Sequence, residues 1–310
     1  MKRIAMTGPT GAIGIALIEK AIFENIEVYA LCRSNSKRID RIPKHPLVHI
    51  IECDLAEMKD FSTEKLPECD VFYHFGWAAT IGGGRNDTGL QLDNIKYTLD
   101  AVDLADRLGC KKFIGAGSQA EFGRYEGALN VNVPVFPETG YGIAKLCAGQ
   151  LSRIECQKRG MQHIWTRILS IYGPYDNDKT MIMSTINKLL NNEVPSLTKG
   201  EQKWDYLYSE DAARAMLAIG SKGVNGKVYC IGSGQVRPLK EYINILRDEI
   251  DPNASLGIGD IPYGINQVMY LCADLKELTE DTGFVPQIEF REGIKRTICW
   301  VRSRKENEKN

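Results

Sequence analysis

The chain begins with a glycine-rich segment that limits which folds it can adopt. The segment Thr7-Gly8-Pro9-Thr10-Gly11-Ala12-Ile13-Gly14 follows a short apolar run, residues 2–7, and opens an amphipathic helical pattern, residues 12–24. In a strand–turn–helix unit, one glycine permits a tight turn, one lets backbone N–H groups approach a pyrophosphate, and one lets helix and strand pack closely. The helix N-terminus adds partial positive charge. This opening predicts a dinucleotide site, with contacts from Thr7, Gly8, Gly11, Ala12, Ile13 and Gly14.

Short β-rich runs alternate with helical runs along the next part of the chain. The expected strands are 27–32, 47–53, 71–75, 112–117 and 163–169, and the expected helices are 91–108 and 141–158. This alternation predicts an α/β fold with a parallel, doubly wound Rossmann sheet. Ligands of such sheets bind beyond the carboxyl ends of the strands, where Thr7, Arg33, Asp54, Phe75, Ser118 and Ser170 fall.

The pattern becomes less regular from residue 173, with Gly and Pro interruptions. Short helices are expected at 180–191, 238–250 and 274–282. We expect a dinucleotide-binding domain at 1–172 and 204–236, and a smaller, interleaved C-terminal substrate-binding part at 173–203 and 237–303. Residues 304–310 form a polar tail, and we expect the chain to fray from residue 302 onward.

Composition excludes several classes of function. A net charge of −1 provides no basic field for nucleic acid. With no run of 18 apolar residues and no signal-peptide pattern, we expect no membrane contact and a cytoplasmic location. The nine cysteines are scattered without a C-x-x-C pair, which is typical of reduced thiols, and the four histidines stand apart, so no metal site is expected.

A second motif, Tyr141-x-x-x-Lys145, indicates proton transfer. A free tyrosine has a pKa near 10 and is a poor catalyst at neutral pH. Lys145 lies on the same helical face, one turn away, and should favour the phenolate of Tyr141. Ser118, at a strand end, can hydrogen-bond the substrate oxygen. With the glycine-rich opening, these residues predict redox chemistry at an alcohol or ketone, with Ser118, Tyr141 and Lys145 as catalytic residues.

Over nearly its whole length the chain resembles an extended short-chain dehydrogenase/reductase of the nucleotide-sugar epimerase/dehydratase family. The matching segments are Thr7–Gly14, Asp54-Leu55, His74–Gly76, Asn94, Ser118–Gly123, Tyr141/Lys145, Arg167–Pro174 and Trp204–Asp211. The resemblance implies a nucleotide-sugar substrate, and a homodimer formed through helices 91–108 and 141–158. It places Lys145 at the nicotinamide ribose, and Tyr141, Phe75, Gly76 and Asn94 at the cofactor. Asp54 and Leu55 are expected to contact the adenine. Asp54 reads equally well as a helix cap.

The residues after the second strand bear on the choice of cofactor. NAD enzymes of this fold usually end that strand with an acidic residue, whereas here Arg33, Ser34 and Arg38 precede the first acid, Asp40. A guanidinium matches phosphate oxygens well. We therefore expect NADP(H), with NAD(H) as the alternative if the loop is only solvated.

The reaction is inferred from that preference and from the residues after Ser118. A 4,6-dehydratase of the family needs Thr-Asp-Glu, but here Gln119 and Ala120 follow Ser118, and Glu121 comes one residue too late. The basic loop favours reduction of a nucleotide-linked 4-keto sugar, with hydride from NADPH and a proton from Tyr141. An NAD-dependent nucleotide-sugar 4-epimerase is the alternative, and a non-catalytic NADP-binding protein is a third reading.

The substrate side departs from the family pattern. Trp204 stands where an arginine commonly binds the diphosphate, and a second arginine expected near Tyr263 is absent. The contact could pass to Lys179, Lys199 or Arg237. Trp204 reads as a core residue or as a stacking surface, and Arg85 as a substrate contact or a solvated charge. The expected substrate contacts are Arg85, Gln119, Ser170, Trp204 and Arg237.

Overall fold

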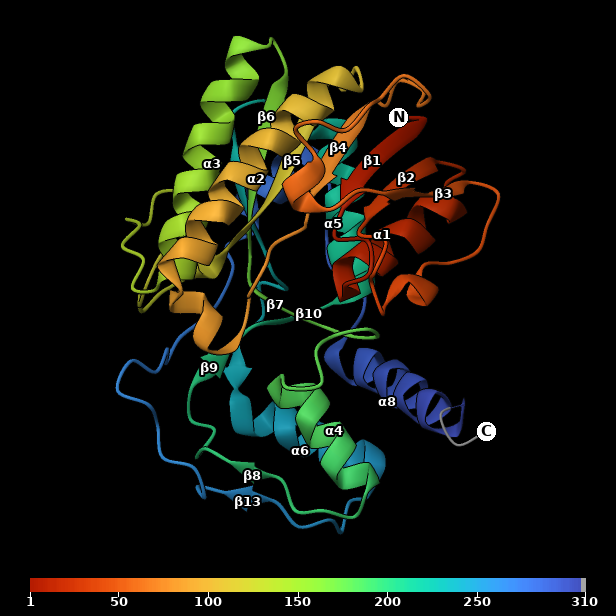
Figure 1. Cartoon of the computed structure of the whole chain (residues 1–310). Helices are drawn as coiled ribbons and strands as arrows, with labels where there is room; N and C mark the ends of the chain where they lie inside the picture. Colours follow the sequence, from red (N-terminus) through yellow and green to blue (C-terminus); the bar gives the residue numbers. More distant parts are fainter. Residues whose placement is uncertain (308–310) are drawn as a thin grey trace.

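The computed structural model describes residues 1–307, and a seven-stranded parallel sheet forms its centre (Figure 1). The strands are β1 (Arg3–Thr7), β2 (Glu27–Cys32), β3 (Val48–Glu52), β4 (Val71–His74), β5 (Lys112–Ser118), β6 (Gln162–Ile168) and β11 (Val228–Ile231). Their order is β11-β6-β5-β4-β1-β2-β3, so the direction of winding reverses between β1 and β4. The doubly wound α/β fold is confirmed, and this reversal is where such sheets bind ligands.

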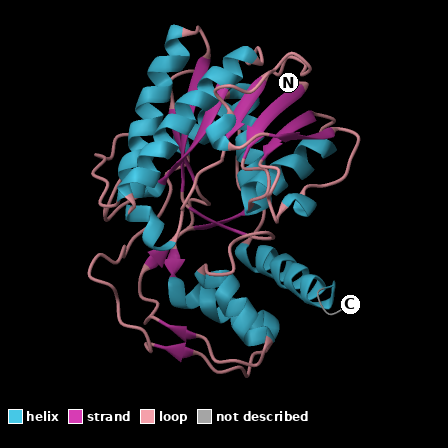
Figure 2. Cartoon of the chain, viewed as in Figure 1, coloured by secondary structure: helices cyan, strands magenta, loops and turns pink. Residues whose placement is uncertain are grey.

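Helices cover both faces of this sheet, as Figure 2 shows. The helices α1 (Ala12–Phe23) and α5 (Ser209–Lys222) pack together on one face, and α2 (Thr88–Arg107) and α3 (Gly140–Lys158) on the other. The first face buries Met6, Leu17 and Met216, and the second buries Phe72 and Phe113. Each such side chain contributes roughly 2 kcal/mol by leaving water. Two packed layers therefore hold the strand ends in place.

Short 3₁₀ turns follow several strands at the carboxyl edge of the sheet. They are η1 (Ile39–Arg41), η2 (Leu55–Glu57), η3 (Gly82–Asn86) and η4 (Gln119–Glu121). These turns and their flanking loops carry several predicted site residues, which are Arg33, Ser34, Arg38, Asp54, Leu55, Phe75, Gly76, Arg85 and Gln119.

A smaller part lies beyond that edge and has its own core. It contains α4 (Met181–Leu190), α6 (Leu239–Ile250) and α8 (Phe290–Asn307), with the strand pairs β8 (Ser196–Leu197)/β13 (Gly257–Ile258) and β9 (Lys203–Trp204)/β12 (Arg237–Pro238). The pair β7 (Ser170–Tyr172)/β10 (Tyr206–Tyr208) lies between the two parts (Figure 1). The core of the smaller part includes Tyr172, Ile186, Tyr242 and Phe290. In contrast to the sequence-based boundaries, α7 (Lys276–Thr282) packs on α5 and β11 of the larger part.

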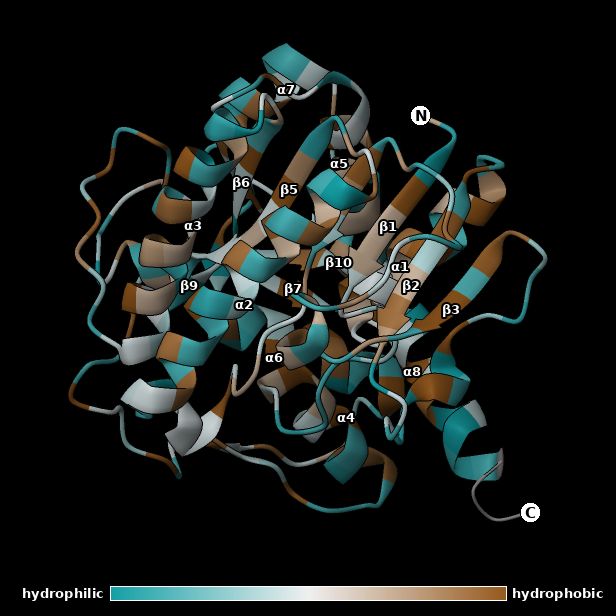
Figure 3. Cartoon of the chain, turned by 45° about the horizontal axis from the view of Figure 1, so that its top comes forward, coloured by the Kyte–Doolittle hydropathy of each residue, from teal (hydrophilic) through white to brown (hydrophobic). Residues whose placement is uncertain are grey.

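The sequence predictions missed α5 and α8, and the expected fraying of the tail was wrong as far as residue 307. The helix α8 continues through 304–307, while 308–310 lie outside the described residues. It buries Ile294, Ile298 and Val301, a spacing of four and three residues that places them on one face. Alternating hydrophobic and hydrophilic colours along the helices are visible in Figure 3. Among residues 1–307, every helix is too short or too polar to cross a bilayer.

Candidate active site

The glycine-rich turn between β1 and α1 has the geometry that a dinucleotide requires. Gly8 has φ +69°, and a Cβ there would lie 2.8 Å from the backbone nitrogen of Gly76. A Cβ on Gly14 would collide with the carbonyl oxygen of Gly8. Gly11 is the N-cap of α1, no side chain within 1–307 caps that helix, and a Cβ there would meet only the Gly8 oxygen, at 3.9 Å. The first N–H groups of α1 therefore face an open approach that suits phosphate oxygens.

A hydrogen-bonded chain ties the end of β1 to the end of β4. Thr7 Oγ1 accepts from the Gly76 N–H at 3.0 Å and lies 2.9 Å from His74 Nδ1. Thr98 Oγ1 donates to the Asn94 carbonyl, so it accepts from His74 Nε2 at 3.3 Å. Burial lowers the pKa of His74 to about 3. The ring is therefore neutral, carries its proton on Nε2, and accepts from Thr7.

The other predicted cofactor residues lie around this turn. Leu55 packs close to Gly76, since a Cβ on that glycine would come within 2.8 Å of Leu55 Cδ2. Asp54 caps η2 by accepting from the Ala56 N–H at 3.2 Å, so the capping interpretation of Asp54 holds in the structure. Phe75 donates its N–H to the carbonyl of Thr7, while Arg33, Ser34 and Arg38 are exposed in the loop after β2.

Asn94, predicted to contact the cofactor, holds the loop that follows β4. Its Oδ1 accepts from the Ala78 N–H at 2.8 Å, and its Nδ2 donates to the Ala78 carbonyl at 3.0 Å and to the Leu90 carbonyl at 3.1 Å. The side chain is thus committed to the protein backbone. Its direct contact with a cofactor stays a prediction.

The three predicted catalytic residues meet at the carboxyl end of β5. Ser118 ends that strand and hydrogen-bonds Tyr141, which lies in the first turn of α3. Lys145 is 97% buried, its Nζ donates to the Ala116 carbonyl at 2.5 Å, and it lies 5.8 Å from the centroid of the Tyr141 ring. A hydroxyl, a phenol and an amine therefore converge beside the glycine-rich turn.

Burial sets the proton affinities of this cluster. It raises the pKa of Tyr141, and the hydrogen bond from Ser118 and the charge of Arg85 partly offset that rise. Burial lowers the pKa of Lys145 to about 7, against the opposing effect of Glu121. Burial therefore allows Lys145 to lose its proton far more easily than an exposed lysine.

Replacing Lys145 with methionine is expected to raise the melting temperature while abolishing activity. Between pH 7 and 10.5, where Lys145 titrates in the folded and unfolded chain respectively, the unfolded chain binds more protons, so wild-type stability rises with pH. The variant lacks this buried cation, so its advantage should be largest below pH 7 and vanish above pH 10.5. Calorimetry across this range tests the effect, and an advantage that does not change with pH would contradict it.

Two residues that the sequence analysis did not identify complete the cluster. The ring centroid of Trp77 lies 3.7 Å from Lys145 Nζ and 6.0 Å from the Tyr141 centroid, edge to face. Trp77 Nε1 donates to Gln91 Oε1 at 3.0 Å, and Gln91 Nε2 donates to the Gly84 carbonyl at 2.9 Å. Gln91 therefore braces the loop that carries Trp77. The sequence shows only an amide at position 91 on an expected helix, and this does not indicate the contact with Trp77.

The carboxylate of Glu121 is buried, and both of its oxygens have partners. Its Oε2 lies 2.9 Å from Arg167 Nε, and its Oε1 accepts from the Ser118 N–H at 2.8 Å and from Trp165 Nε1 at 3.0 Å. Glu121 and Ser118 cap η4 reciprocally. The carboxylate thus fixes the turn that presents Ser118, rather than facing a substrate as a free base.

Three of the five predicted substrate residues, Ser170, Trp204 and Arg237, lie in or next to the smaller part. A cavity of ≈ 360 Å³ is lined by Lys179, Lys188 and Trp204, among others. Trp204 Nε1 donates to Ser170 Oγ at 2.8 Å, which brings two predicted contacts together. Arg237 pairs with Trp204 across β9 and β12 but lines a separate hollow of ≈ 30 Å³ and lies 4.0 Å from Glu289.

The remaining two candidates lie close to the catalytic cluster. Gln119 follows Ser118 in η4 and is partly exposed. The guanidinium of Arg85 lies over the ring of Tyr141, with its Cζ 4.4 Å from the centroid. Neither residue lines the cavity beside Trp204.

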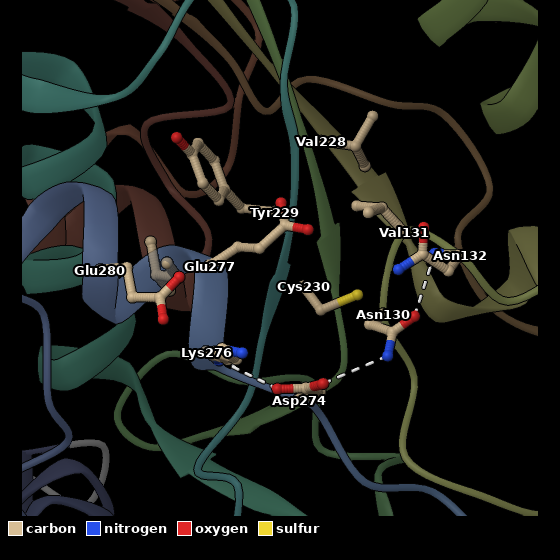
Figure 4. A pocket seen from close by; sticks show the side chains of 11 residues that line it. Asn130, Val131, Asn132, Val228, Tyr229, Cys230, Asp274, Lys276, Glu277 and Glu280 are labelled. Carbon is tan, nitrogen blue, oxygen red and sulfur yellow. Dashed lines mark hydrogen bonds between the residues drawn. The ribbon is translucent and has the colours of Figure 1, made fainter.

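A second cavity, of ≈ 340 Å³, lies at the edge strand β11 (Figure 4). Asn130 Nδ2 donates to Asp274 Oδ2 there at 3.1 Å, and Cys230 and Glu277 contribute to the lining. None of the predicted site residues lines this cavity, so it is separate from the catalytic cluster. Within 1–307, no group of three or more His, Cys, Asp or Glu side chains is arranged to hold a metal ion.

Comparison with known proteins agrees with the fold. The chain is 26% identical to a putative UDP-glucose 4-epimerase of Methanocaldococcus jannaschii, over 97% of this chain and 98% of the relative. It superposes on a UDP-N-acetylglucosamine 4-epimerase from Methanobrevibacter ruminantium with TM-score 0.88 and 20% identity, over 98% and 99% of the two chains.

A second solved structure, a dTDP-glucose 4,6-dehydratase from Streptomyces venezuelae with NAD bound, gives TM-score 0.85 and 20% identity, covering 98% of each chain. The model of the NAD dependent epimerase/dehydratase family matches residues 4–232. The chain therefore belongs to the NAD dependent epimerase/dehydratase family and is an enzyme of the extended short-chain dehydrogenase/reductase type.

Proposed function

We propose that the chain catalyses the NADP(H)-dependent reduction of a nucleotide-linked 4-keto sugar. The observation that carries this proposal is Arg33, which directly follows β2 where NAD enzymes usually have a carboxylate. Arg33, Ser34 and Arg38 are exposed, and β2 pairs with β1, so this loop lies beside the glycine-rich turn. A 2′-phosphate on the adenosine ribose would meet two guanidinium groups and a hydroxyl.

The residues of the cluster supply the proton chemistry. The dinucleotide, when bound, provides the hydride for the keto carbon. Ser118 donates a hydrogen bond to the keto oxygen and orients it, and Tyr141 donates its phenolic proton to the same oxygen. The π bond of the carbonyl is thereby broken, C–H and O–H bonds form, and the C–O single bond remains. The remaining phenolate is stabilised by the nearby cations, including Lys145 when it is protonated.

The cavity beside Trp204 is a suitable binding site for the nucleotide part of the substrate. Lys179 and Lys188 supply positive charge along its lining, and Trp204 and Tyr206 supply aromatic surface. Among the three candidates for the diphosphate, Lys179 is the one that lines this cavity. We therefore assign the diphosphate to Lys179, with Lys188 in support.

Exposed apolar side chains on α2 and α3 support a homodimer. They are Leu92, Ile143, Leu151 and Ile154. These two helices pack side by side, so a second copy would cover both together. A four-helix interface of this kind leaves the carboxyl edge of the sheet accessible to substrate.

An NAD-dependent 4-epimerase is the second candidate. It is favoured by the relative from Methanocaldococcus jannaschii and by the structure from Methanobrevibacter ruminantium, both of which are named as 4-epimerases. NAD is also the dinucleotide in the Streptomyces venezuelae structure. In an epimerase, Tyr141 would move the proton in both directions and the cofactor would be returned unchanged.

The test begins with titrations of stripped protein by NADPH and NADH, followed by mixing with a nucleotide-linked 4-keto-6-deoxy sugar. We expect NADPH to bind more tightly and its absorbance to fall on mixing.

Replacing Arg33 with glutamine should weaken NADPH binding about tenfold or more and leave NADH binding unchanged, because a charge-assisted bond contributes about 1.5–3 kcal/mol. Lys37→Gln, in the same exposed loop, is the matched control. Retained NAD with interconversion of two 4-hydroxy sugars would instead establish the epimerase.

A further inference from the structure

Arg85, rather than Lys145, provides the cation that lies closest to the ring of Tyr141. The Arg85 Cζ is 4.4 Å from the ring centroid, whereas Lys145 Nζ is 5.8 Å away. The amine of Lys145 instead donates to the Ala116 carbonyl and lies over the face of Trp77. Arg85 is therefore a second cation, besides Lys145, that lies close enough to act on the phenol of Tyr141.

The loop that carries Arg85 is tied to the start of α3. The Gly140 N–H donates to Asn86 Oδ1 at 2.9 Å, and Arg85 Nη1 donates to the Thr80 carbonyl at 3.0 Å. Gln91 holds the preceding Gly84 carbonyl. Both neighbours of Arg85 are thus hydrogen-bonded, Gly84 through its carbonyl and Asn86 through its side chain, and the Asn86 bond reaches the residue immediately before Tyr141.

Other charged groups around Tyr141 do not substitute for this contact. Glu121, from η4, raises the pKa of Tyr141, although its carboxylate is paired with Arg167. Lys145 is on the same helix, but burial lowers its pKa to about 7, which weakens it as a source of positive charge. A guanidinium over an aromatic face attracts a phenolate more strongly than a phenol, because the negative charge spreads over the ring. The position of Arg85 therefore opposes the effect of burial on Tyr141.

We propose that Arg85 is a positioning residue that stabilises the Tyr141 phenolate and so sets the pH range in which Tyr141 exchanges its proton. This inference rests on the proposed function only in taking Tyr141 as the proton donor. The same contact fixes the ring plane, which keeps the hydroxyl directed toward Ser118. Arg85 thereby acts on the reaction through Tyr141.

The experiment is a titration of Tyr141 in the full chain by NMR, with tyrosine labelled by carbon-13 at Cζ. The Tyr141 signal is identified by its loss in Tyr141→Phe. Replacing Arg85 with glutamine should raise the pKa of Tyr141 by about one unit, and Arg85→Lys should restore most of the shift. Arg124→Gln is the matched control, because Arg124 pairs with the exposed Glu138 in the neighbouring segment. The limb of the pH–kcat profile assigned to Tyr141 should move with the NMR value.

An unchanged Tyr141 titration in Arg85→Gln would overturn the inference. If Arg85→Gln does not fold, the comparison of Arg85→Lys with Arg85→Met decides, since only the cation should keep the wild-type value. The NMR titration uses no substrate. A failure to oxidise NADPH would therefore overturn the proposed function and leave this result intact, whereas NADPH oxidation with an unshifted tyrosine would overturn the inference alone.

Discussion

Replacing Tyr141 with phenylalanine is expected to lower kcat for ketone reduction by about a thousandfold, within the range that general acid catalysis contributes. The change removes only the hydroxyl, so the edge-to-face contact with Trp77 and the cation contact with Arg85 remain. Cofactor affinity and melting temperature should therefore change little. Stopped-flow loss of NADPH absorbance, measured with a fixed keto-sugar concentration, gives the rate.

The matched control for this variant is Tyr125→Phe, which removes the hydroxyl of a tyrosine that is 43% exposed and lies outside the cluster. It should retain the wild-type rate. Ser118→Ala should also slow the reaction, but by less, because water can replace one hydrogen bond to the keto oxygen. A Tyr141→Phe enzyme with wild-type kcat would mean that another group donates the proton.

The larger part of the fold was predictable because local signals there agree with one another. The strand over 27–32 was placed at its observed bounds, and the helix over 141–158 was placed within one residue. The glycine-rich turn, the alternation of elements and the parallel sheet all follow from patterns a few residues long. The smaller part was outlined less completely, because its strands are only two residues long and each pairs with a strand that is separated from it in the sequence by at least one helix.

The helices α5 and α8 were not predicted from the sequence for a different reason. The helix α5 begins at Ser209, inside a segment that was noted for its motif and not for its periodicity. The helix α8 carries many charged residues, and its buried stripe contacts α6, which is distant in sequence. Both helices are stabilised by tertiary packing, which the local polarity of the sequence does not reveal.

In the candidate site, sequence motifs pointed to some residues in advance, whereas others became visible only through their contacts in the folded structure. Ser118, Tyr141 and Lys145 meet as their spacing predicted. Trp77 depends on Gln91 of α2, which also bonds the Gly84 carbonyl. The position of Arg85 depends on its neighbour Asn86, which accepts from the Gly140 N–H at the start of α3. No spacing along the chain encodes such a pairing, so only the folded structure brings these side chains to Tyr141.

The buried pair of Glu121 and Arg167 gives the largest expected effect on stability. Their side chains are 1% and 6% exposed, and the carboxylate also holds the Ser118 turn. Glu121→Gln leaves the guanidinium without a countercharge, which typically costs about 3–5 kcal/mol. Such a loss corresponds to a fall in melting temperature of about 10 °C. The variant has one carbonyl oxygen in place of two, so its NH₂ group must face either Arg167 or the Ser118 N–H, and kcat should fall as far as the Ser118 turn moves.

A double-mutant cycle separates the charge from the packing. Arg167→Met keeps an apolar side chain against Phe122, whose ring the guanidinium now covers at 4.5 Å. In Glu121→Gln/Arg167→Met no buried charge remains, so the double variant should be less destabilised than the sum of the single variants by about 2 kcal/mol or more. Glu138→Gln, which breaks the exposed pair with Arg124, should leave the melting temperature nearly unchanged. Additive losses in the cycle would mean that Glu121 acts through its hydrogen bonds to Ser118 and Trp165 and that its pairing with Arg167 adds nothing to stability.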